Sequence, residues 1–184
     1  MTVSELISQA RELYVRHFLT FAELQNEKWC GSGVTEAKFE IPERDAPDLF
    51  RNLYCVDFLI KHEDHVEGCE LQPHTVLTFE PFTSKVRGVS VLFERLEWDD
   101  VVLHYDGPDI ERTDLNRWFE HWFDPDDARL QPDTVPCQIV HALFARPGYL
   151  CVDFGTAPIE AFWDLFDLVA AGATHIRVAS QSTD

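Results

Sequence analysis

The sequence predicts an α+β fold for residues 1–184: one domain with a mainly antiparallel or mixed sheet, a long N-terminal helix and a C-terminal strand-helix-strand unit packed on it. Three observations support this fold class. Apolar residues recur with helical spacing near the N-terminus, alternate with polar residues in the middle, and switch between both patterns near the C-terminus. With 184 residues, 45% of them hydrophobic, the chain can bury one sizeable core. We therefore expect a single domain built on about five to seven strands.

The N-terminal segment has the pattern of a long amphipathic helix. Thr2 and Glu5 are spaced as in a capping box, in which each side chain bonds the backbone N–H of the other residue. Apolar side chains then follow at intervals of three and four residues, at Leu6, Ile7, Ala10, Leu13, Tyr14, Phe18, Phe21 and Leu24. Gly31 and Gly33 should end this segment.

Several segments in the middle of the chain have the apolar or alternating pattern of strands. A short helix is expected from residue 49, and the strand candidates are residues 34–41, 55–60, 75–79, 88–96 and 101–105. Asp99 and Asp100 are turn-forming residues between two such segments, so residues 88–105 are predicted to form a hairpin. Because hairpin strands are antiparallel, the sheet is not expected to be purely parallel.

The segment before the C-terminal unit is predicted to contribute one more helix. Thr113 is placed to cap a helix over residues 114–123, and Asp124 with Pro125 ends it. The loop that follows is rich in Asp and Pro, and residues 137–144 fit either helix or strand.

Residues 149–180 carry the signals of strand, helix and strand in succession. The apolar run over residues 149–154 indicates a strand, and Thr156 can cap the helix that follows. Gly172 supplies a left-handed stop for that helix, and residues 175–179 return as a strand. This pattern predicts a structural part of the fold and does not indicate an activity.

The charge of the chain is strongly one-sided. It has 33 acidic and 15 basic residues, for a formal net charge of −18. Such a surface repels phosphate backbones and anionic lipid headgroups, so we expect no direct nucleic-acid or membrane binding. It attracts basic proteins for the same reason.

From cysteine usage and hydropathy we expect a cytoplasmic protein. The five cysteines are odd in number, scattered and never in a Cys-x-x-Cys pair, so neither a disulfide framework nor a zinc ribbon is indicated. No apolar run approaches the roughly 20 residues that span a membrane, and no secretory signal pattern opens the chain.

An acidic, aromatic segment, residues 97–133, is the predicted interaction surface. It holds 12 acidic residues, three arginines and three of the five tryptophans. Aromatic residues cover more of the predicted helix than one core-facing stripe requires, so some rings should remain exposed among carboxylates. The alternative is a helix whose rings all pack in the core. The candidate contact residues are Trp98, Asp99, Asp100, Trp118, Glu120, Trp122, Asp124, Asp126 and Asp127.

From this segment we expect a non-enzymatic binding protein of the bacterial cytoplasm that captures a basic protein partner. In size and charge, though in no motif, the chain resembles small acidic immunity proteins and antitoxins. No cofactor is expected for this role. A second possibility is that the aromatic helix forms a homodimer.

The competing prediction is a metal-binding protein or metal-dependent enzyme. His62, His65, Cys69 and His74 offer imidazole and thiolate ligands within a short segment, as zinc or another divalent ion requires. Their spacing matches no specific zinc motif, and a polar loop between two strands explains them equally well.

Sequence signals for catalysis are weak. His104, Tyr105 and Asp106, with Glu120 and His121, are the only acid-base candidates, and strand alternation sends His104 and Tyr105 to opposite faces. Phosphate-binding and dinucleotide-binding motifs are absent from the sequence, so no catalytic residue is assigned.

Overall fold

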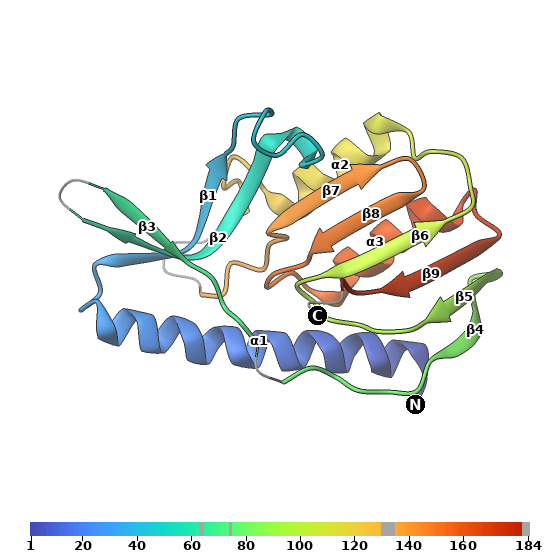
Figure 1. The fold of residues 1–184 in the computed structure, drawn as a ribbon, viewed down its shortest axis with the longest axis horizontal. Helices are drawn as coiled ribbons and strands as arrows, with labels where there is room; N and C mark the ends of the chain where they lie inside the picture. The colour runs from blue at the N-terminus through green and yellow to red at the C-terminus, as the bar shows by residue number, and fades with distance from the viewer. Residues whose placement is uncertain (63–64, 74, 130–134, 182–184) are drawn as a thin grey trace.

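Two β-sheets and three α-helices make up the part of the chain that the computed structural model describes, residues 1–62, 65–73, 75–129 and 135–181 (Figure 1). The helices are α1 (Val3–Lys28), α2 (Arg112–Phe123) and α3 (Ile159–Ala170), with a 3₁₀ turn η1 (Phe50–Asn52). The smaller sheet has the order β1-β2-β3 and contains β1 (Gly33–Glu40), β2 (Leu53–Lys61) and β3 (Val66–Cys69). The larger has the order β4-β5-β9-β6-β8-β7 and contains β4 (Phe82–Val86), β5 (Val89–Phe93), β6 (Val101–Tyr105), β7 (Ala142–Arg146), β8 (Tyr149–Asp153) and β9 (His175–Ala179). The α+β class is confirmed.

The long N-terminal helix is confirmed, including its start. The Thr2 hydroxyl accepts a hydrogen bond from the Glu5 N–H at 3.2 Å, and the Glu5 carboxylate accepts one from the Thr2 N–H at 2.6 Å. One side of α1 is buried, through Leu6, Ile7, Ala10, Tyr14, Phe18 and Ala22. The helix runs along both sheets, so its apolar side forms part of the core that they share (Figure 1).

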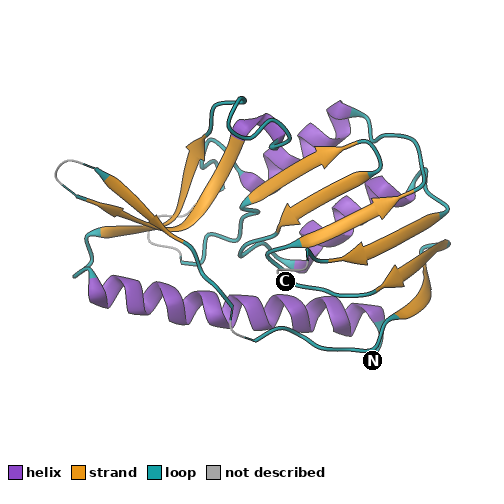
Figure 2. Cartoon of the chain, viewed as in Figure 1, coloured by secondary structure: helices purple, strands orange, loops and turns teal. Residues whose placement is uncertain are grey.

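Helices α2 and α3 pack side by side behind the larger sheet (Figure 2). The buried residues of both helices join the α1 side chains and the inner face of the sheet in one apolar core. On the other face of the sheet, Val102, Cys151 and Ala179 form a small separate cluster.

The predicted hairpin over residues 88–105 is wrong. Strand β9 lies between β5 and β6, parallel to β5 and antiparallel to β6. The connection between β5 and β6 is not a tight turn, because Leu96 and Trp98 within it are each only 1% exposed and are anchored in the core. Strand β5 instead forms a hairpin with β4, through a turn at Arg87 and Gly88.

The C-terminal strand-helix-strand unit is confirmed as β8, α3 and β9, with β6 inserted between its two strands. Two of its predicted end signals are wrong. Pro158 is the N-cap of α3, and Thr156 is instead buried in a polar network. Gly172 is not left-handed; a Cβ there would lie 2.8 Å from Pro108 Cδ, so the glycine permits two loops to approach closely.

Other sequence-based boundaries shift modestly. The predicted helix over residues 114–123 begins at Arg112, with Glu111 as N-cap and no side-chain cap from Thr113. Residues 75–79 form no strand, and the segment 137–144 contributes the start of β7. The described residues contain nine strands, more than expected, because the chain builds two sheets.

The contribution of α3 to the stability of the core can be tested by substitution of Phe162. Its side chain is fully buried and its ring lies against Phe154, Trp163 and Phe166 at centroid distances of 5.8, 5.2 and 6.1 Å. We expect Phe162→Ala to lower the free energy of unfolding by about 3–5 kcal/mol, because it leaves a cavity. Chemical denaturation measures this. The control Leu24→Ala, at a side chain that is 58% exposed, should change it by less than about 0.5 kcal/mol.

Candidate functional site

The three tryptophans of the acidic segment do not lie on the surface. Trp98, Trp118 and Trp122 are 1%, 5% and 7% exposed. The Trp118 indole donates a hydrogen bond to the Ala161 carbonyl at 2.9 Å, and that of Trp122 donates to Asp164 at 3.2 Å. Helix α2 needs a wide apolar surface because it packs against both the sheet and α3. The expectation of exposed rings is therefore wrong, and these tryptophans are not accessible to a second copy of the chain.

The acidic candidates of this segment are divided between different places. Asp124 is 4% exposed, and its carboxylate accepts hydrogen bonds from the N–H groups of Ala128 and Arg129, both at 2.9 Å. It therefore shapes the turn after α2 rather than facing a partner. Glu120, Asp126 and Asp127 are exposed, although Glu120 pairs with Arg51 at 3.0 Å and Asp127 pairs with Lys38 at 2.5 Å.

Asp99 and Asp100 belong to a different surface from α2. They line a depression with Tyr54, Cys151 and Asp153. The Asp100 carboxylate accepts hydrogen bonds from the Cys151 thiol at 3.3 Å and from the Gln181 N–H at 2.5 Å. Because Cys151 lies in the cluster on the sheet face that α2 and α3 leave open, the predicted contact residues do not form one continuous surface.

Sequence reasoning missed a buried polar network around His141. The imidazole is fully buried, with Nε2 3.0 Å from Glu36 Oε1. Nδ1 lies 3.1 Å from Asp57 Oδ1, in ion-pair contact rather than in an aligned hydrogen bond, and 3.9 Å from Asp153 Oδ2. The Thr156 hydroxyl also donates to Glu36. The network joins β1 and β2 of the smaller sheet to β8 and the start of β7 in the larger one.

Two backbone features create room for this network. Glu36 has a φ of 54°, a left-handed conformation within β1, and its side chain is buried although the alternation of the strand predicts an exposed one. Gly155 has a φ of 49°, and a Cβ there would lie 2.2 Å from the His141 ring. Neither feature has a periodic signal in the sequence.

The charges of the network favour an imidazolium between carboxylates. Burial alone would lower the pKa of His141, but the surrounding acidic groups, including Asp153, Asp57 and Glu36, hold it well above its ordinary value. Burial would likewise raise the pKa values of Glu36 and Asp57, but the interactions with His141 lower both. Burial and neighbouring negative charges raise the pKa of Asp153 well above its usual range. Since carboxylates lie beside both imidazole nitrogens and the ring is fully buried, His141 acts as an internal clamp between the elements that carry them.

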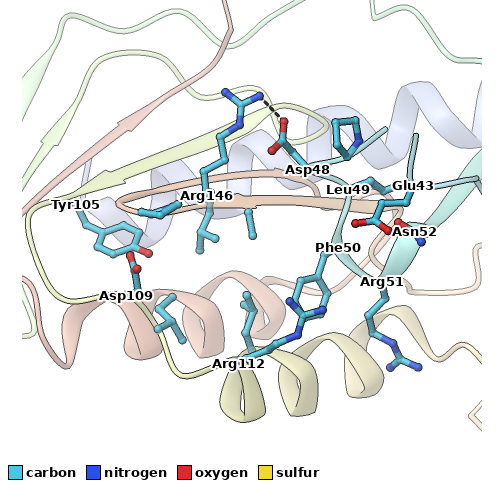
Figure 3. Close-up of a pocket in the computed structure, with 16 residues that line it drawn as sticks. Glu43, Asp48, Leu49, Phe50, Arg51, Asn52, Tyr105, Asp109, Arg112 and Arg146 are labelled. Carbon is cyan, nitrogen blue, oxygen red and sulfur yellow. Dashed lines mark hydrogen bonds and ion pairs between the residues drawn. The ribbon is translucent and has the colours of Figure 1, made fainter. Parts of the chain in front are cut away.

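A groove of about 400 Å³ lies beside α2 (Figure 3). Arginines from three segments border it. Arg146 pairs with Asp48 at 2.5 Å, and Arg112 lies over the Phe50 ring at 5.5 Å. Arg51 points away from the groove and pairs with Glu120 at 3.0 Å (Figure 3).

The remaining lining of the groove is partly apolar. Leu49, Phe50, Ile110, Leu115 and Leu150 contribute side chains, and Glu43 and Asp109 supply carboxylates for which the described residues show no ion pair. The groove therefore combines an apolar lining with charges of both signs. Its parts come from residues 43–52, 105–115 and 145–150, so no local sequence pattern could have revealed it.

The predicted metal-ligand set is brought together only in part. His62 and His65 lie together at the end of the β2–β3 hairpin, with Glu67 beside them. Cys69 pairs with Phe58 farther down the hairpin and is not among the grouped ligands. His74 lies outside the described residues.

The acid-base candidates are divided between two places: His104, Tyr105 and Asp106 line a depression of about 590 Å³, and Glu120 and His121 lie elsewhere. The His104 ring stacks edge-on against Tyr149 at 5.1 Å, on the open face of the larger sheet. Asp106 accepts hydrogen bonds from Thr174 and His175 in a loop contact. Glu120 and His121 lie on α2, behind the sheet (Figure 1).

Comparisons of the chain with protein-family models, with curated proteins and with solved structures find no match. None of the described helices combines the length and apolar character that crossing a bilayer requires.

Replacing one carboxylate of the network tests its energetic role. We expect Glu36→Gln to lower the free energy of unfolding by about 3–5 kcal/mol, because a buried charge loses its partner while the side-chain volume is kept. Urea denaturation provides the measurement. The matched control is Asp114→Asn, which breaks an exposed pair with Arg117 at 3.1 Å and should cost less than about 1 kcal/mol. Equal losses in the two variants would contradict the clamp.

The network also predicts an acid-shifted stability optimum. The raised pKa of His141 gives stability that is complete below its ordinary value of 6.5 and is lost as the pH rises through the folded-state value. The lowered pKa of Glu36 gives stability that is present above its ordinary value of 4.5 and is lost as the pH falls. Thermal unfolding across a pH series should therefore show a maximum between these two values. In His141→Gln the melting temperature should fall less steeply on the alkaline side of this maximum. An unchanged fall would contradict the assignment of the pH dependence to His141.

Proposed function

We propose that this chain is a non-enzymatic, cytoplasmic acidic protein that captures a basic protein partner, in the manner of an antitoxin or immunity protein. The observation that supports this is the net charge of −18 together with exposed carboxylates on α2 and the turns at its two ends. We define the acidic α2 surface as Asp109, Glu111, Glu120, Asp126 and Asp127.

The proposed surface differs from the one expected from sequence, because it contains no tryptophan. Charge on such a surface speeds encounter with a basic protein and sets the orientation of the complex. Affinity needs an anchor that is buried on binding, which the tryptophans cannot offer.

The groove beside α2 is the better candidate for that anchor site. Leu115 and Phe50 line it, and Asp109 belongs both to the groove and to the acidic α2 surface. An arginine or lysine of the partner could place its aliphatic stem against the apolar lining and its charge near Asp109 or Glu43.

A matched pair of charge variants tests this proposal. The chain is immobilised in extract of its host at low salt, basic proteins released by high salt are identified, and their affinities are measured with purified protein. We expect Glu120→Gln/Asp126→Asn/Asp127→Asn to weaken binding by about tenfold, since three exposed charges at roughly 0.5 kcal/mol each combine to that factor.

The control variant is Glu12→Gln/Glu23→Gln/Glu27→Gln, which removes three exposed charges from α1. It should retain the affinity of the unmodified protein. An equal loss in both variants would show that the chain acts as an unspecific polyanion, and failure to retain any basic protein would remove the basis of the proposal.

A further inference from the structure

The β2–β3 hairpin carries a group of side chains that could bind a metal ion. None of them belongs to the acidic α2 surface. The hairpin extends from the body of the molecule at the end opposite β4 and β5 (Figure 1). At its end the His62 N–H donates to the His65 carbonyl at 2.8 Å, and the two imidazole rings stack with centroids 4.4 Å apart and an interplanar angle of 16°. His62 and His65 therefore lie side by side.

Glu67 completes this group. One ligand atom from each of His62, His65 and Glu67 lies within 4.8 Å of the others. Glu67 stands opposite Ile60 in the strand register, two residues from His62. Cys69 is two residues farther along β3, which corresponds to about 7 Å along a strand, so it is replaced by Glu67 in the ligand set.

The His62 imidazole has an unused nitrogen that faces this group. Its Nε2 is shielded from solvent and has no hydrogen-bond partner among the residues that the structure describes, although Glu67 Oε2 lies 3.5 Å away. The ring also lies nearly perpendicular to that of Trp29, at a centroid distance of 5.7 Å. Buried polar atoms normally have a partner, so an unpaired nitrogen oriented by packing points to a missing one.

We propose that His62, His65 and Glu67 form a binding site for a divalent transition-metal ion of the zinc class. Two imidazole nitrogens and one carboxylate oxygen are ligands that zinc, copper and nickel accept, whereas calcium and magnesium prefer oxygen alone. Three protein ligands leave a coordination position for water, and the exposed side chains of His65 and Glu67 place that position toward solvent. The ion ties β3, an edge strand paired only with β2 in its sheet, to the end of β2.

Metal titration of the full chain tests this site. After dialysis against a chelator, Zn²⁺ is titrated calorimetrically and Co²⁺ binding is followed by its visible absorption. We expect one ion per chain, a higher melting temperature with Zn²⁺, and a loss of at least about tenfold in affinity in His65→Ala and in Glu67→Gln. Both substitutions are at exposed side chains, so circular dichroism should show an unchanged fold.

Cys69→Ser is the control and should bind the ion as tightly as the unmodified chain. Weakened binding in Cys69→Ser, or undiminished binding in His65→Ala, would overturn the proposed ligand set. Uptake without saturation at one ion per chain would overturn the site itself. These results do not depend on the capture of a basic protein.

Discussion

The arrangement of the two sheets depends on a buried ionic contact at their junction. His141 connects them through its main chain as well as its side chain, because its carbonyl accepts from the Cys55 N–H and its own N–H donates to the Asp153 carbonyl, both at 2.9 Å. Placing an imidazolium and carboxylates inside an apolar core is costly unless every charge has a partner. We infer that the contact specifies one relative position of the sheets, since any other position leaves Glu36 and Asp57 unpaired.

Local sequence signals predicted the parts of the fold that form from neighbouring residues. The capping box at Thr2, the length of α1 and the unit from β8 to β9 were recognisable because periodicity and end signals lie within a single segment. Strand order was not predictable in this way. The position of β9 between β5 and β6 results from packing between segments about 80 residues apart in sequence, and a pattern within one segment carries no information about such partners.

The candidate surfaces were predicted less well, for two physical reasons. The rings of Trp118 and Trp122 were assigned to the surface because one stripe was assumed to suffice for α2, whereas a helix that packs on a sheet and on another helix buries more of its circumference. The burial of Glu36 required a left-handed residue within a strand, which alternation does not indicate. By contrast, His62 and His65 were predicted to lie together because both belong to one short segment, whereas the position of Glu67 beside them and of Cys69 farther away needed the strand register.

The place of β9 in the larger sheet has a consequence for how the protein is made. Strand β9 follows every other described strand in the sequence, yet it fills an interior position. During synthesis the facing edges of β5 and β6 therefore stay unpaired until residue 179 has emerged from the ribosome, so the larger sheet closes after translation of nearly the whole segment. Unpaired strand edges can pair with the wrong strand. In this chain the edges of β5 and β6 stay exposed to such pairing for longer than in a sheet built from sequential hairpins.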